Sequence, residues 1–203
     1  MFPSLALTVA ASYMNAFSPL AGFRSEKAAQ IAAYIIKAHK GHMEKLALIK
    51  MIYIGERESI RSRGRPMIYD ELYSLKDGPI CKSALDGING HIDEKVWEKY
   101  IILQGDRDVY SVRGGAEDLD QLSRSDFKIL DLVIARHQGW SSSQLRNWLH
   151  DSRNCSEYVE VFGKQRAPIE YGELALAVGI ENPIDVEHEI KAYRASESLI
   201  PRS

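Results

Sequence analysis

The chain has 203 residues, of which 45% are hydrophobic and 27% are charged, and its formal net charge is −2. This composition excludes an intrinsically disordered protein, which would have fewer apolar residues and a larger net charge. The small net charge also excludes a general electrostatic attraction to nucleic acid or to an anionic membrane. No apolar run in the sequence approaches the roughly 20 residues that a membrane-spanning helix needs, so we expect no membrane partner.

The charged residues are unevenly distributed along the chain. From Glu44 to Arg65, six basic and three acidic side chains give a net charge of +3. From Asp86 to Asp131, eleven acidic and six basic side chains give a net charge of −5. Such a division suits an oriented encounter with a partner, and it suits equally well two solvated faces of one domain.

Two features indicate a reducing, cytoplasmic location. Cys81 and Cys155 are far apart in the sequence and have no neighbouring metal-spaced partner, which indicates free buried thiols. Residues 1–22 carry no charge, so the basic segment that opens a secretory signal is missing before Arg24. We therefore expect an N-terminal extension at residues 1–24 and a protein that stays in the cytoplasm.

The first part of the chain predicts two helices followed by a strand. Ser25 is a suitable N-cap for a helix that Gly41 ends. A second amphipathic helix spans about residues 43–62, with its basic side chains away from its apolar face. It ends at Gly64-Arg65-Pro66, because proline disfavours a helical conformation for the residue before it. Residues 67–75 (MIYDELYSL) are rich in Tyr, Ile and Leu and predict a short strand.

The middle of the chain predicts a turn, a short helix and a hairpin. The Asp77-Gly78 turn and then Pro79, which lacks an amide donor, end the preceding strand. A short helix is expected to follow over residues 81–88. Residues 100–112 predict a β-hairpin around Gly105-Asp106.

The last part of the chain predicts helices. Ser123 can cap a helix over residues 125–138, and Ser141 or Ser142 can cap the next one. Two more helices are expected, over residues 167–178 and 184–195. Together these elements predict a mainly α (α+β) fold, a compact helical domain with a small antiparallel β-sheet or hairpin.

The sequence lacks the common motifs of hydrolases, metal sites and phosphate loops, such as G-x-S-x-G, H-E-x-x-H and G-x-G-x-x-G. His150 is the best candidate for acid–base chemistry, because Asp151 is its neighbour and Ser143 or Cys155 could act as a nucleophile. A histidine at a helix end is, however, more often a structural hydrogen-bonding group. We therefore predict that the protein is not an enzyme and has no cofactor and no metal.

A run of arginines marks the end of the second predicted helix and is followed by two tyrosines. These residues are Arg57, Arg61, Arg63, Arg65, Tyr69 and Tyr73. The first interpretation is a charged helix end that the helix dipole favours. The second is an anchor for an acidic protein, because Arg and Tyr are enriched in binding hot spots, and the third is a nucleic-acid contact.

Several short motifs occur in a recognisable order. They are the helix motif Leu48–Ile54 (LIKMIYI), the Gly64-Arg65-Pro66 turn, the Gly78-Pro79 turn, the L-S…I-L-D pattern of residues 122–131 and a helix over residues 143–150 that closes with a histidine. In this order they resemble the Panacea domain, the SocA-like antitoxin domain of bacterial and phage toxin–antitoxin systems. The resemblance covers about residues 25–160 and leaves residues 161–203 as a C-terminal helical extension that we expect to pack on the same domain.

The resemblance implies an antitoxin that neutralises a cognate toxin protein, encoded next to it, by direct contact. Some members of the family instead act as adaptors that deliver a toxin to a protease, so an adaptor remains an alternative. A nucleic-acid-binding regulator is a further alternative, although the net charge does not favour nucleic acid as a partner.

We place the partner-binding residues around the rigid Gly-Pro turn, where large side chains with polar tips gather. The predicted partner-binding residues are Lys50, Arg57, Arg65, Tyr69, Tyr73 and Lys76. A second set is predicted to hold the fold and consists of Tyr53, Gly64, Pro66, Gly78 and Pro79.

Overall fold

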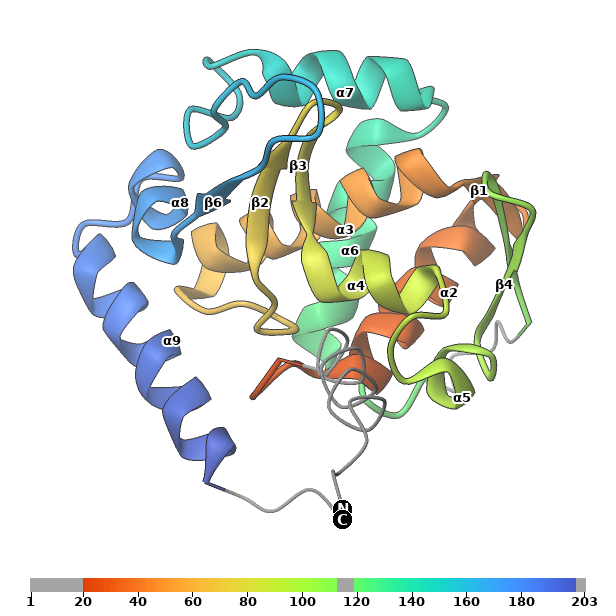
Figure 1. Ribbon diagram of the computed structural model, residues 1–203, viewed down its shortest axis with the longest axis horizontal. Helices are drawn as coiled ribbons and strands as arrows, with labels where there is room; N and C mark the ends of the chain where they lie inside the picture. Colours follow the sequence, from red (N-terminus) through yellow and green to blue (C-terminus); the bar gives the residue numbers. More distant parts are fainter. Residues whose placement is uncertain (1–19, 113–118, 200–203) are drawn as a thin grey trace, which may run out of the picture.

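The computed structural model describes residues 20–112 and 119–199. The elements in chain order are α2 (Ser25–Ala38), β1 (His42–Glu44), α3 (Lys45–Arg63), β2 (Leu72–Leu75), β3 (Gly78–Cys81), α4 (Lys82–Ile88), α5 (Glu94–Trp97), β4 (Ile101–Gln104), β5 (Asp108–Ser111), α6 (Arg124–His137), α7 (Ser142–His150), β6 (Ala167–Ile169), α8 (Tyr171–Ala177) and α9 (Pro183–Ser198). The predicted α+β class is confirmed, because this part of the chain consists mainly of helices together with two small antiparallel sheets (Figure 1). Most of the predicted N-terminal extension lies outside the described residues.

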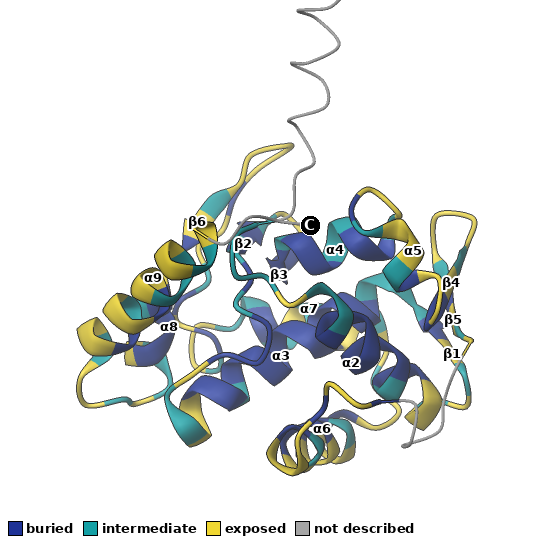
Figure 2. Ribbon diagram, turned by 90° about the horizontal axis from the view of Figure 1, so that it is seen from below, coloured by how far each residue is buried: buried dark blue, intermediate teal, exposed yellow. Residues whose placement is uncertain are grey.

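Helix α3 forms the centre of the domain. Helices α2, α6, α7 and α8 and strand β3 all pack against it. Every residue from Ala47 to Ile54 is buried, and Figure 2 shows α2 and α3 as the most deeply buried helices. A helix covered on all sides must bury its polar residues together with its apolar ones. The prediction of an amphipathic helix with solvated basic side chains is therefore wrong for Lys50 and Arg57, which are both buried.

One sheet has the strand order β3-β2-β6. The Asp77-Gly78 turn joins β2 to β3, and Gly78 has a φ of +98°, which a side chain would strain. Sequence analysis treated Pro79 as the end of β structure, but Pro79 lies within β3 opposite Ser74. This is possible because β3 is an edge strand, where a missing amide donor removes no ladder bond.

Two further predictions for this sheet need correction. The strand predicted over residues 67–75 is limited to Leu72–Leu75, because the backbone amides of Met67 and Ile68 donate to the carboxyl group of Glu56 and not to a neighbouring strand. The helix predicted over residues 167–178 begins only at Tyr171. Its first residues form β6, which pairs with β2.

The other sheet has the order β1-β5-β4. The predicted hairpin is confirmed, with β4 and β5 as its antiparallel arms. Strand β1 adds to β5 with His42 opposite Tyr110. Sequence analysis did not predict β1 or the short helix α5, because each has only three or four residues.

The helix caps test the local predictions. Ser123 and Ser141 begin α6 and α7 with capping boxes, in which Asp126 and Gln144 return the hydrogen bond, so both predicted N-caps are confirmed. Ser25 is not an N-cap but the first residue of α2. Its hydroxyl accepts a hydrogen bond of 3.1 Å from the indole of Trp97, which fixes α5 against the start of α2.

The C-terminal segment contacts the rest of the domain through hydrogen bonds to the chain after α3. The Tyr171 hydroxyl donates to the carbonyl of Asp70 at 2.9 Å, and Arg194 of α9 donates to the carbonyl of Tyr69 at 3.2 Å. The boundary placed at residue 160 stays a prediction. Among the described helices, none is both long and apolar enough to cross a membrane.

Candidate partner-binding groove

The structure separates the predicted partner-binding residues into buried and accessible ones. Lys50 is fully buried and donates to the carbonyl of Pro79 at 2.9 Å. Arg57 is 5% exposed, and its guanidinium holds both carboxylate oxygens of Glu157 at 2.5 and 3.3 Å. Neither side chain is free to act as a surface anchor. The physical reason is the central position of α3, which sequence spacing alone did not reveal.

The other four predicted residues are accessible, and the two tyrosines among them contact different segments of the chain. Arg65 and Lys76 are exposed, and Tyr69 and Tyr73 are half-buried. The Tyr69 ring packs on Tyr193 of α9 with centroids 4.1 Å apart, and the guanidinium of Arg166 lies 5.0 Å from the Tyr73 ring. The structure therefore does not gather these residues with Arg57 into one cluster. Their role in partner binding stays a prediction.

The residues predicted to hold the fold occupy structural positions. The Tyr53 hydroxyl donates to Glu157 at 3.0 Å, so Tyr53 and Arg57 share one buried carboxylate. Gly64 ends α3 in the left-handed conformation, with φ of +68°. Pro66, Gly78 and Pro79 are buried.

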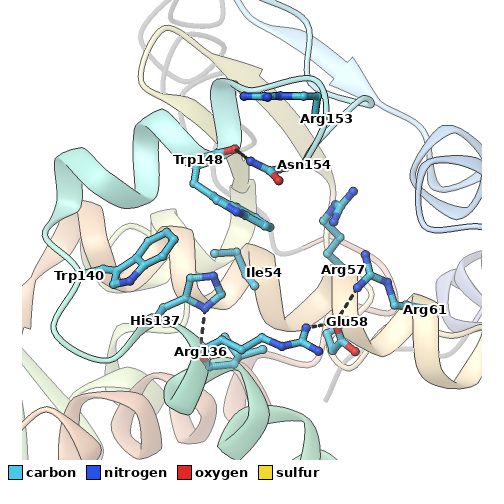
Figure 3. A pocket seen from close by; sticks show the side chains of 11 residues that line it. Ile54, Arg57, Glu58, Arg61, Arg136, His137, Trp140, Trp148, Arg153 and Asn154 are labelled. Atoms are coloured by element: carbon cyan, nitrogen blue, oxygen red, sulfur yellow. Dashed lines mark hydrogen bonds and ion pairs between the residues drawn. The ribbon is translucent and has the colours of Figure 1, made fainter.

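A groove of about 430 Å³ opens between α3, α6, α7 and the segment after α7 (Figure 3). We call it the Trp–Arg groove. It is lined by Ile54, Arg57, Glu58, Arg61, Val133, Arg136, His137, Trp140, Trp148, Arg153 and Asn154. Four arginines and one glutamate give the lining a net charge of 4 − 1 = +3 with His137 neutral.

One side of the Trp–Arg groove is aromatic. Trp140 and Trp148 stand edge-on to the His137 ring, with centroids 4.8 and 5.4 Å away. The Nδ1 atom of His137 donates to the carbonyl of Val133 at 2.9 Å, and burial lowers the pKa of the imidazole. His137 is therefore a neutral ring at physiological pH, and this side of the groove is an uncharged aromatic surface.

The other side of the Trp–Arg groove is cationic. Arg61 and Arg136 approach the same carboxylate oxygen of Glu58, at 3.4 and 3.3 Å, so two guanidinium groups share one negative charge. Figure 3 shows Arg57, Arg61 and Arg136 near Glu58, across the groove from Trp148. Arg61, Arg136 and Arg153 keep 43%, 52% and 87% of their side chains exposed. Their unused N–H donors are available to carboxylates of a partner.

The catalytic alternative finds no assembled nucleophile and base. Asp151 binds Arg153, and this hydrogen bonding lowers the pKa of the Asp151 carboxyl to about 2. Burial raises the pKa of the Cys155 thiol to about 12, so it is not a ready nucleophile. Among the described contacts, none joins His150 to Asp151, Cys155 or Ser143.

Sequence analysis missed much of the groove. Arg57 and Arg61 belong to the arginine run that the sequence indicated, but Arg136, Trp140, Trp148 and Arg153 were not predicted as contacts. The sequence does place Trp140 just before α7 and Trp148 within it, in a basic region. Whether these tryptophans line a groove depends on how α6 and α7 pack.

Comparison with known families adds independent information. A family model described as "Antitoxin SocA-like, Panacea domain" matches residues 48–155 of the chain. All residues that line the Trp–Arg groove fall within this range. Neither the curated proteins nor the solved structures contain a match to the chain.

Proposed function

We propose, since this chain belongs to the antitoxin SocA-like Panacea domain family, that it neutralises a cognate toxin protein by binding it directly at the Trp–Arg groove. The observation that carries the proposal is the pairing of two tryptophans with exposed arginines around one concave surface. Tryptophan and arginine are the residue types most enriched in binding hot spots. An aromatic surface beside cations suits a toxin segment that combines an apolar side chain with carboxylates.

Carboxylates of a partner would contribute binding free energy at the groove. A partner carboxylate at the groove would complete a pair with Arg61 or Arg136, which now share Glu58. Such charge-assisted hydrogen bonds contribute about 1.5–3 kcal/mol each when water is excluded. A stable complex buries roughly 1,600 Å² in total, so the toxin would extend beyond the groove. Arg65, Tyr69, Tyr73 and Lys76 are proposed as additional contacts of this larger interface.

Neutralisation would then follow from mass action. A toxin held by this protein is removed from its free pool, and the fraction removed depends on concentration relative to the dissociation constant. The proposal requires no cofactor and no chemical step. Co-expression with the toxin distinguishes direct neutralisation from protease delivery and from nucleic-acid binding.

The test is co-expression of this protein with the product of the neighbouring open reading frame, scored by growth and by co-purification. We expect the neighbour to be toxic alone and to be rescued within a stable complex. An Arg61→Ala/Arg136→Ala/Trp148→Ala variant should lose both rescue and complex. Arg124→Ala, which removes an exposed arginine at the start of α6 outside the groove, should keep both.

The three substituted side chains are partly exposed, so thermal unfolding should show that the variant remains folded. Normal rescue and normal affinity in this folded variant would exclude the Trp–Arg groove as the binding site. Rescue without any complex would instead favour delivery to a protease. Salt-dependent binding to nucleic acid that is lost in the variant would favour a regulator.

A further inference from the structure

A second cavity, of about 370 Å³, lies beside the start of α3. It is bounded by α3, the β2–β3 turn, α4 and residues 163–165. We call it the Lys50 cavity. Four lysines, one aspartate and several apolar side chains line it. Its volume falls in the range of small-molecule sites, which are mostly apolar with a few polar groups that fix the ligand.

The Lys50 side chain is buried and forms no ion pair with a carboxylate among the described residues. Its side chain is fully buried, and its ammonium group donates one hydrogen bond, to the carbonyl of Pro79. An ammonium group has three donors, so this single acceptor leaves it under-satisfied. Within residues 20–112 and 119–199, the ion pairs of the structure include no carboxylate partner for Lys50.

A second under-satisfied nitrogen lies close to Lys50. The Nε2 atom of His150 is buried and has no hydrogen-bond partner among the described residues. A Cβ atom placed on Gly78 would lie 3.2 Å from the ammonium nitrogen of Lys50 and 3.3 Å from Nε2 of His150. The two nitrogens therefore lie under the same turn, where the missing side chain of Gly78 leaves them their space. Buried polar groups without partners are rare in native proteins and call for an explanation.

The surroundings of Lys50 favour an anion with an apolar body. Lys76 and Lys164 are exposed at the cavity, and the one acidic lining residue, Asp77, is held by Arg146 at 3.4 Å. With Lys50 protonated, the four lysines and Asp77 give the lining a net charge of 4 − 1 = +3. Leu46, Ile49 and Ile80 supply apolar surface beside the buried cation. This apolar surface favours an anion that carries a hydrocarbon chain over a free phosphate, which would leave the surface uncovered.

We propose that the Lys50 cavity binds a small aliphatic carboxylate, whose carboxylate pairs with the ammonium group of Lys50 and whose hydrocarbon chain packs on Leu46, Ile49 and Ile80. This site is distinct from the Trp–Arg groove and does not depend on the toxin-binding proposal. The bound carboxylate supplies the counter-ion that no described residue provides, and the hydrocarbon chain is removed from water.

The test uses the purified full chain and octanoate, followed by calorimetric titration and by the midpoint of thermal unfolding. We expect octanoate to bind and to raise the unfolding midpoint, as any ligand specific for the native state does. Acetate lacks the hydrocarbon chain and octanol lacks the charge, so each should bind at least about tenfold more weakly. These two comparisons separate the apolar contribution from the ionic one.

Two variants assign binding to Lys50. Lys50→Met keeps the length of the buried stem and should weaken octanoate binding at least about tenfold while the protein stays folded. Lys37→Met, at an exposed position of α2 outside the cavity, should bind octanoate normally. Equal octanoate binding by Lys50→Met, or no binding by the wild type at millimolar octanoate, would overturn the proposal. The proposal would also be overturned if a peptide with a C-terminal leucine binds and octanoate does not.

Discussion

Replacing Lys50 by methionine is expected to stabilise the protein although it removes a hydrogen bond. Burial lowers the pKa of Lys50 from its ordinary value of 10.5 to about 7. Between these two pH values the unfolded chain keeps a proton on this lysine and the folded chain does not. The folded state therefore gains stability as pH rises from 7 toward 10.5, and it carries the full penalty of the buried cation below pH 7.

The magnitude follows from the shift. The depressed pKa of Lys50 lowers the free energy of unfolding of the wild type by about 4 kcal/mol at pH 7 and by about 2 kcal/mol at pH 9. Loss of the hydrogen bond to the Pro79 carbonyl costs about 1–2 kcal/mol at either pH. Lys50→Met should thus be more stable than the wild type by about 2–3 kcal/mol at pH 7, and by about 0–1 kcal/mol at pH 9.

Urea unfolding of both proteins at pH 7 and pH 9 measures this difference, and other titrating groups cancel in the comparison. Lys37→Met serves as the control, because Lys37 is exposed and its replacement should change stability little at either pH. A Lys50→Met variant that is destabilised to the same extent at both pH values would refute the reasoning. That result would mean that the native state holds Lys50 as a satisfied group.

Three further predictions test other parts of the fold. Glu157→Ala should destabilise the protein by about 3–5 kcal/mol in urea unfolding, because it leaves a buried guanidinium unpaired, whereas Asp151→Ala at an exposed pair should have little effect. Gly87→Ala places a Cβ atom in collision with the buried indole ring of Trp97 and should lower the thermal midpoint markedly, while Gly172→Ala meets its nearest atom at 3.5 Å and should not. Burial raises the pKa of Glu56 from 4.5 to about 8, so its contribution to stability should fall as pH rises from 4.5 through 8. Urea unfolding across this range should show a flatter profile for Glu56→Gln, and identical profiles would contradict the buried, protonated carboxyl.

The parts of the fold that were predictable are those that local sequence determines. The capping boxes at Ser123 and Ser141 need only residues three positions apart, and the β4–β5 hairpin needs only its own turn. Strand β6 was mistaken for helix because its pairing with β2 joins segments about 95 residues apart. Pro79 was read as a strand breaker because sequence alone does not distinguish an edge strand from a central one.

The candidate site was less predictable than the fold. The enrichment of arginine and tyrosine in hot spots directed attention to the end of α3. It did not reveal that Arg57 forms a buried ion pair with Glu157, which follows it by 100 residues. Of the two tryptophans in the Trp–Arg groove, Trp140 lies in the α6–α7 connection and Trp148 lies in α7. Their convergence on Arg61 depends on helix packing, for which the sequence contains no short-range signal.

The polar residues on α3 point to a division between structure and function. Lys50, Tyr53 and Arg57 follow one another at helical spacings of three and four residues and so lie along one buried face. Tyr53 and Arg57 are satisfied by Glu157, so they fix the segment after α7 against α3 and need no ligand to explain them. Lys50 forms no ion pair with a carboxylate among the described residues, and the unpartnered Nε2 atom of His150 lies near the same missing side chain of Gly78. An apolar residue in its place would remove the penalty of burying a cation. The same residue therefore links the two Lys50→Met experiments: a gain in stability together with a loss of carboxylate binding would show that the buried cation serves a ligand rather than the fold.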